Sequence, residues 1–202
     1  MIAQSLVDGA LNRLSVHFGS KLVVRPPATA GELAALESCA GPLPRDLTIF
    51  LSTCNGLRVE VDAPDGLRRL WHTHEMVHTL RVAPGPGLVP VRGAADGERN
   101  SVVVIPGVTY GAVVRWDPWA PRAELLASCL GGYLDAWSRF LVDQFDRDGH
   151  PLALRPEPSR LCFTVEHIIP HDPAARRWRE DIHVERWLNR LNHQVACGDD
   201  FE

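Results

Sequence analysis

Hydrophobic residues at the start of the chain recur at the spacing of a helix. Side chains three or four positions apart lie on one face of a helix, so the pattern predicts an amphipathic N-terminal helix. Its apolar positions are Leu6, Ala10, Leu11, Leu14 and Phe18. A short extended segment is expected at residues 21–25, before Pro26 and Pro27.

Two further helices are predicted between residues 29 and 56. Thr29 and Glu32 have the spacing of a capping box, in which each residue satisfies a backbone N–H of the other. Gly41 allows the chain to leave the first helix, and Pro44 suits the first turn of the second. Asn55-Gly56, which tolerates positive φ, ends the second helix. The apolar stripes are Leu33, Leu36 and Ala40, and then Leu47, Phe50, Leu51 and Cys54.

After Gly56 the apolar residues alternate with polar ones, which is typical of half-buried strands. A hairpin is predicted, with strands at residues 57–61 and 67–71 around an Asp65-Gly66 turn. A short helix is predicted over residues 74–80. The remaining elements up to Gly149 are expected as strands at 88–91, 101–105 and 111–116 and a helix capped by Ser128, with its core stripe at Leu130, Leu134, Trp137 and Leu141.

Residues 150–202 have a different character. Prolines at 151, 156 and 158 predict a linker, and Leu161–Ile169 predicts one more strand. Asp172-Pro173 predicts the start of a helix that runs to about Val195. The apolar stripe of this helix is Val184, Trp187, Leu188, Leu191 and Val195. We expect the stripe to pack on the preceding domain rather than on a partner, because most amphipathic helices bury their stripe within their own domain.

This order of elements predicts an α+β fold. Helices, then strands, then a helix, without regular βαβ alternation, indicate a largely antiparallel or mixed sheet flanked by helices. We expect one domain over residues 1–149 and a C-terminal extension over 150–202, with its extra strand and helix packed on the same domain.

The composition is that of an ordinary globular protein. The chain has 202 residues, 45% of them hydrophobic, and a net charge of −4, unlike the basic footprint of a nucleic-acid-binding protein. The five cysteines contain no C-x-x-C pair and suit a reducing compartment. Polar residues interrupt the N-terminal apolar run, so no signal peptide is expected. No apolar run is long enough for a membrane span, and we expect a cytoplasmic protein.

The motifs of the first two-thirds of the chain follow the order of a known family. E-L-A-A-L-E precedes G-P-L-P-R-D-L-T-I-F-L-S-T-C-N-G-L, and L-V-P-V and G-A-V-V-R-W-D-P-W follow. With these motifs residues 28–142 resemble the SUKH superfamily, which includes fungal cell-wall-assembly regulators of the Smi/Knr type and many bacterial immunity proteins. Residues 150–202 have no counterpart in the family pattern. The fingerprint residues of the resemblance are Glu32, Leu43, Pro44, Phe50, Leu51, Asn55 and Gly56.

The resemblance implies an α+β fold without enzymatic activity or cofactor. Bacterial members resemble antidotes that bind a cognate toxin, often a nuclease, and block it. Because nucleases commonly present basic substrate grooves, acidic and aromatic side chains on the strand loops are the expected partner-binding groups. They are Asp62, Asp65, Asp96, Glu98, Asp117 and Trp119. The alternative for each is a solvated carboxylate or a packed tryptophan.

One motif argues for a different function. His74-Glu75-Met76-Val77-His78 matches H-E-x-x-H, which on a helix places two imidazoles on one face for zinc, with the glutamate as general base. Glu98 lies at a spacing where some zinc peptidases have their third ligand. Against this, the chain has nine histidines, which favours a chance match, and turns at 84–87 and 94–97 interrupt the helix that a third ligand needs.

The sequence therefore leads to three functional hypotheses. The first is an immunity protein that binds and neutralises a toxin, with a protein as its partner and no nucleic acid, membrane, metal or cofactor. The second is a regulatory interaction protein without a toxin partner. The third is a zinc-dependent hydrolase that uses His74, Glu75 and His78.

Overall fold

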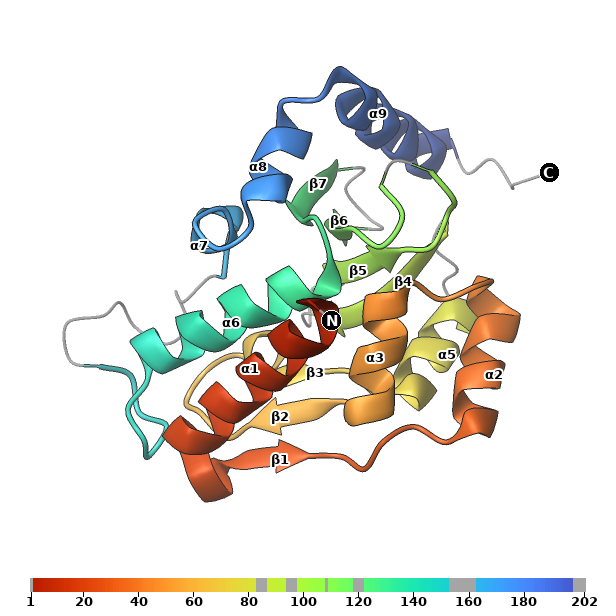
Figure 1. Ribbon diagram of the computed structural model, residues 1–202. Coiled ribbons are helices and arrows are strands. Elements are labelled where there is room, and N and C mark those ends of the chain that lie inside the picture. The colour runs from red at the N-terminus through yellow and green to blue at the C-terminus, as the bar shows by residue number, and fades with distance from the viewer. Residues whose placement is uncertain are drawn as a thin grey trace.

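The computed structural model describes residues 2–82, 87–93, 98–107, 109–117, 122–152 and 163–197. Helices surround two antiparallel sheets, so the predicted α+β class is confirmed (Figure 1). No helix among the described residues is long and apolar enough to cross a membrane. The helices are α1 (Ile2–Phe18), η1 (Gly19–Lys21, a 3-10 turn), α2 (Ala30–Ala40), α3 (Arg45–Thr53), α4 (Asp65–Arg68), α5 (Thr73–Val82), α6 (Leu130–Gln144), α7 (Val165–Ile168), α8 (Pro173–Arg179) and α9 (Ile182–Cys197).

The strands form two sheets that meet at one point. The strands are β1 (Leu22–Val24), β2 (Leu57–Val59), β3 (Arg69–Leu70), β4 (Leu88–Gly93), β5 (Arg99–Val103), β6 (Val113–Asp117) and β7 (Arg122–Ala127). The spatial orders are β1-β2-β3 and β4-β5-β6-β7, and every pairing is antiparallel. The N–H of Trp71 donates to the carbonyl of Val91 over 2.9 Å, which ties the end of β3 to β4.

Helix α6 supplies the largest side chains of the main core. Trp137 and Tyr133 are fully buried, and Trp137 Nε1 donates to the carbonyl of Leu67 over 2.9 Å. Helix α1 runs beside α6 (Figure 1). Of its predicted stripe, Ala10, Leu14 and Phe18 are buried in the core, and Val7 is buried in place of Leu6. Burial of each large apolar side chain contributes about 1.5–3 kcal/mol, so this helix pair contributes strongly to the main core.

Helix α9 packs on the opposite face of the four-stranded sheet. Val184 and Leu191 are buried there with Val114, Trp116 and Leu125. Trp187 and Leu188 pack partly buried against the same cluster. Both faces of the sheet are therefore covered, one by α6 and the other by α9.

The C-terminal helices also cover the open edge of β7. Asn192 Oδ1 accepts from the N–H of Ala123, and Arg179 Nη1 donates to the carbonyl of Leu125. Asp172 accepts from both the N–H and the hydroxyl of Ser128. An edge strand with unpaired backbone groups is a template for aggregation, and here side chains from three points of the extension occupy those groups.

Four local expectations were wrong. Asp65-Gly66 starts the helical turn α4 rather than forming a hairpin turn. In place of the strand expected at Leu161–Ile169, residues 165–168 form α7, whose Thr164 and His167 form a capping box. The long C-terminal helix is two helices, because Asp181 accepts from the N–H of His183 and starts α9 anew. The N-cap of α6 is Cys129 rather than Ser128.

Strand β7 is an element that the sequence did not predict. Its residues 122–127 read R-A-E-L-L-A, which is rich in helix formers. Leu125 packs on the α9 side and Leu126 on the α6 side. Because both faces are buried, the period-2 alternation that identifies a strand is missing.

Three of the fingerprint residues, Glu32, Asn55 and Gly56, lie together around the starts of α2 and α5. The capping box of Thr29 and Glu32 is present as predicted, and Asn55 Nδ2 donates to Glu32 Oε1 over 3.1 Å. Asn55 also bonds Thr73 twice: its Oδ1 accepts from the N–H, and its Nδ2 donates to the hydroxyl. Gly56 has a φ of 88°, and a Cβ there would lie 3.0 Å from the backbone nitrogen of His72.

The other fingerprint residues have packing roles. Phe50 and Leu51 are fully buried and Leu43 nearly so. Pro44 lies at the N-cap of α3, one residue earlier than expected. Positive φ occurs at Gly56 but not at Asn55, so the asparagine is required here for its amide and not for its backbone.

We expect Asn55→Ala to lower the free energy of unfolding by about 2 kcal/mol, because it leaves the buried N–H of Thr73 without an acceptor. Urea unfolding followed by circular dichroism measures the change. Asn12→Ala is the matched control, since Asn12 is exposed on α1 and should change stability by no more than about 0.5 kcal/mol. Equal stabilities of the two variants would contradict the role given to Asn55.

Asp172→Ala should cost about 2–3 kcal/mol. The substitution removes the N-cap of α8, in which the Asp172 carboxylate accepts a hydrogen bond from the N–H of Ala175. It also leaves the N–H of Ser128 without its acceptor. Asp181→Ala, which removes one exposed cap in the same segment, should cost about 1 kcal/mol or less. If Asp172→Ala lowers the free energy of unfolding no more than Asp181→Ala does, the hydrogen bonds between Asp172 and Ser128 add nothing to stability.

Candidate functional site

Two of the predicted partner-binding carboxylates, Asp65 and Glu98, lie beside arginines. Asp65 Oδ2 is 2.6 Å from Arg69 Nε, and Asp65 Oδ1 is 3.3 Å from Arg68 Nε. Glu98 Oε1 is 3.4 Å from Arg115 Nε. Asp62 is exposed in the segment between β2 and α4. Asp96, Trp119 and the side chain of Asp117 lie outside the described residues.

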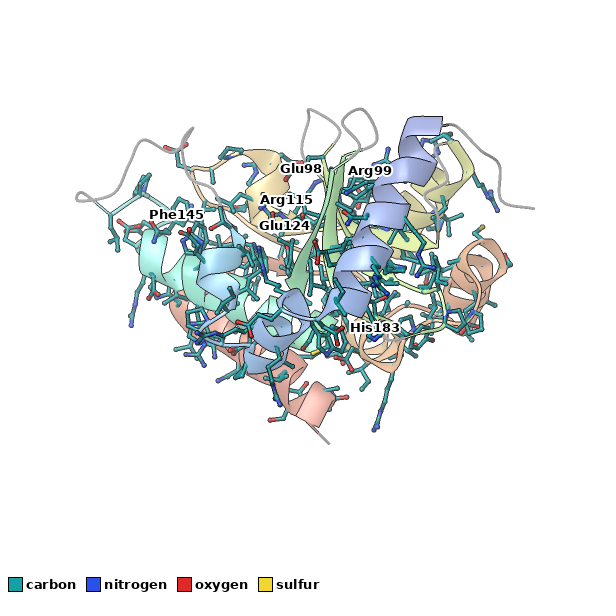
Figure 2. The ribbon with its side chains drawn as sticks, turned by 90° about the horizontal axis from the view of Figure 1, so that it is seen from above. Glu98, Arg99, Arg115, Glu124, Phe145 and His183 are labelled. Carbon is teal, nitrogen blue, oxygen red and sulfur yellow. The ribbon has the colours of Figure 1, made fainter. Side chains whose placement is uncertain are left out.

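Glu98 belongs to a row of alternating charges that we call the charged seam: Glu98, Arg115, Glu124 and Arg179. Arg115 Nη1 lies 3.5 Å from Glu124 Oε2, and Arg179 Nη2 lies 3.2 Å from Glu124 Oε1. Figure 2 shows Glu98, Arg115 and Glu124 on one side of the sheet and Arg99 on the side of α9. The seam joins β5, β6, β7 and α8, and its opposite charges compensate one another within the chain.

A polar cluster around the phenol of Tyr133 lies beside the seam. The hydroxyl oxygen accepts from Arg92 Nη1 over 2.8 Å and from Asn100 Nδ2 over 2.7 Å. The guanidinium of Arg92 also lies 5.7 Å from the ring centroid of Phe163, a cation–π distance. The cavity at this point, between Arg92, Glu98 and Asn100, has a volume of about 20 Å³. That is room for one water molecule and not for a substrate.

The H-E-x-x-H motif lies on α5, but both carboxylate oxygens of its glutamate, Glu75, already have partners within the chain. Glu75 accepts from the backbone N–H of His72 over 3.1 Å, the bond that a glutamate at the third helical position makes to the helix cap. Its other oxygen is 2.6 Å from Arg69 Nη1. His74 and His78 are exposed, and burial lowers the pKa of His72. Among the described side chains, which include Glu98, no three His, Cys, Asp or Glu residues gather as metal ligands.

The thiols of Cys54 and Cys129 are not poised as nucleophiles. Burial raises the pKa of Cys54 to about 12 and the pKa of Cys129 to about 11. A thiol reacts as its thiolate, which is nearly absent at neutral pH when the pKa is this high. Cys39 is exposed and free.

An open groove lies between α9 and the turn that joins β5 to β6. We call it the α9 groove; its volume is about 860 Å³. Apolar groups of Ile105, Trp187 and Leu191 line it together with the polar side chains of His183, Arg186 and Arg190. Figure 2 places His183 at the beginning of α9. None of the described lining residues is acidic.

Sequence reasoning missed this groove. The spacing of His183, Arg186 and Arg190 puts them on one flank of a helix. The sequence alone could therefore have indicated a basic flank next to the predicted apolar stripe. Their approach to the turn at Pro106 is a tertiary contact that no local pattern encodes. Tyr110 fixes the turn, because its hydroxyl donates to the carbonyl of Pro42 over 3.2 Å.

Comparison with known protein families finds no family model that matches this chain, and comparison with curated proteins finds no match. The resemblance to the SUKH superfamily therefore depends on the motifs quoted for it. Function has to be argued from the geometry of the chain itself.

Substitution of Glu75 distinguishes two roles for this residue, a helix cap and a general base. Glu75→Ala should lower the free energy of unfolding by about 1 kcal/mol, the typical value of a cap, and Glu75→Gln should lose less, because glutamine also fits a capping box. Neither variant, nor His78→Ala, should change the zinc content of protein purified without added metal. Stoichiometric zinc that disappears in His78→Ala would overturn this assignment.

Proposed function

We propose that the protein is a non-catalytic module that binds another protein, and that it serves as the antidote of a toxin. The observation that carries the proposal is the contrast between closed polar clusters and the open α9 groove, whose volume of about 860 Å³ exceeds that of a second groove along α1, about 500 Å³. The phenol of Tyr133, the carboxylate of Glu75 and the seam are engaged within the chain. The α9 groove is open and holds cationic side chains at the surface.

The resemblance to the SUKH superfamily supports a toxin as the partner. The fingerprint residues that carry it form a coherent unit, in which Glu32, Asn55 and Gly56 meet around one helix start. Such a unit positions other elements. This fits a scaffold that presents variable surfaces to different partners.

A cytoplasmic location belongs to the same proposal. Cys39, Cys54 and Cys129 are free thiols, and Cys39 is exposed. Unpaired cysteines suit a reducing compartment. An antidote acting there meets the toxin before it reaches its target.

Titration against a toxin encoded next to this protein tests the proposal. A binding antidote should form a one-to-one complex, and inhibition of the purified toxin should be complete at one equivalent, because each antidote molecule occupies one toxin molecule. Co-expression should restore growth of cells that make the toxin.

Two results would contradict the proposal. Inhibition at a small fraction of one equivalent would indicate an enzyme that modifies the toxin. Binding of a protein partner without any neutralisation would favour the regulatory module instead. An unrelated toxin serves as the specificity control.

A further inference from the structure

The walls of the α9 groove are held by the fold independently of any ligand. Val184 and Leu191 anchor α9 to the sheet, and Asn192 holds the edge of β7. The opposite wall is the turn at Pro106, which Tyr110 ties to the carbonyl of Pro42. A preformed groove lowers the entropic cost of binding.

The charge of the groove has one sign. The guanidinium groups of Arg186 and Arg190 make no hydrogen bond or ion pair to any other described side chain, in contrast to Arg115 and Arg179 of the seam. Arg186 and Arg190 are separated by four positions on α9 and therefore lie on the same side of the helix. The groove therefore attracts a negatively charged ligand.

The lining of the groove is both apolar and cationic, and this combination indicates which class of ligand would fit it. Ile105 and Trp187, which are only partly buried, offer contacts to apolar side chains beside the two arginines and His183. A protein segment that carries both carboxylates and apolar side chains satisfies both kinds of contact. Nucleic acid fits less well, because the net charge of the chain is −4 and nucleic-acid affinity depends on neutralising many phosphates.

We infer that the α9 groove is the docking site for an acidic, extended segment of the protein partner. The inference rests on the proposed function in that it takes the partner to be a protein. It adds the place of contact and the charge of the partner's segment. Arg186 and Arg190 pair with carboxylates of that segment, and its apolar side chains lie against Trp187 and Ile105.

A charge-reversal experiment with a matched control tests this site. The probe is a fluorescein-labelled synthetic peptide of alternating glutamate and leucine, and binding is followed by fluorescence anisotropy. Arg186→Glu/Arg190→Glu should weaken binding about tenfold, since two exposed attractions of up to about 1 kcal/mol each become repulsions. Arg176→Glu/Arg177→Glu makes the same change of net charge on exposed residues of α8 outside the groove, and should stay within about twofold of wild type. Circular dichroism checks that both variants are folded.

Several results would overturn the inference. An equal loss in both double variants would show general attraction rather than a site. Stronger binding of the lysine version of the peptide, or of a short oligothymidine, would contradict an acidic protein segment. Higher salt should weaken the wild-type complex, because the site acts through exposed charges; a salt-independent affinity would count against it.

The same variants separate this inference from the proposed function. If the toxin is neutralised equally by wild type and by Arg186→Glu/Arg190→Glu, the antidote function stands and the docking site is wrong. If no toxin is neutralised but the groove variant alone loses the acidic peptide, the antidote function is wrong and the docking site stands.

Discussion

The side-chain amide of Asn55 is the contact on which the arrangement of the two sheets depends. It accepts from the first N–H of α5 and donates to the glutamate that caps α2, so it holds the starts of two helices together at the end of a third. Hydrogen bonds from the backbone and hydroxyl of Thr29 hold the pKa of Glu32 below its usual range, which keeps the acceptor charged. Because α5 leads from β3 toward β4, fixing its start fixes where the two sheets meet. Gly56 is part of the same constraint, since no larger residue fits against the backbone of His72.

The parts of the fold that could be predicted are those that depend on neighbours within one or two turns. The capping box of α2 and the stripe of α1 are of this kind, and both are present. Strand β7 could not be predicted, because Leu125 and Leu126 are buried on opposite faces by helices that come from different parts of the chain. The break before α9 arises because the Asp181 side chain caps a new helix instead of remaining inside a continuous one. Hydrophobic periodicity does not reveal this competition between side-chain and backbone hydrogen bonds.

The candidate surfaces show the same division. Asp65 and Glu98 could be recognised in the sequence as acidic residues between strands. Their arginine partners, Arg69 of β3 and Arg115 of β6, could not be identified in the same way. Pairing changes the meaning of such a residue, because an exposed carboxylate next to a guanidinium presents little net charge to a partner. The H-E-x-x-H motif is a further case: its glutamate is explained by the helix start at His72, which a motif search does not consider.

The C-terminal extension both attaches to the sheet and lines the α9 groove. Trp187 and Leu191 take part in both, whereas the charged side chains that line the groove belong to it alone. The buried stripe of α9 and the side chains of Asn192, Arg179 and Asp172 hold the extension on β7. His183, Arg186 and Arg190 lie on a different flank of the helix and contribute nothing to that attachment. Because exposed positions away from packed contacts change stability by only about 0.5 kcal/mol, this flank can vary without disturbing the edge of the sheet. A scaffold built this way can keep one fold and change its partner through a few residues of its last helix.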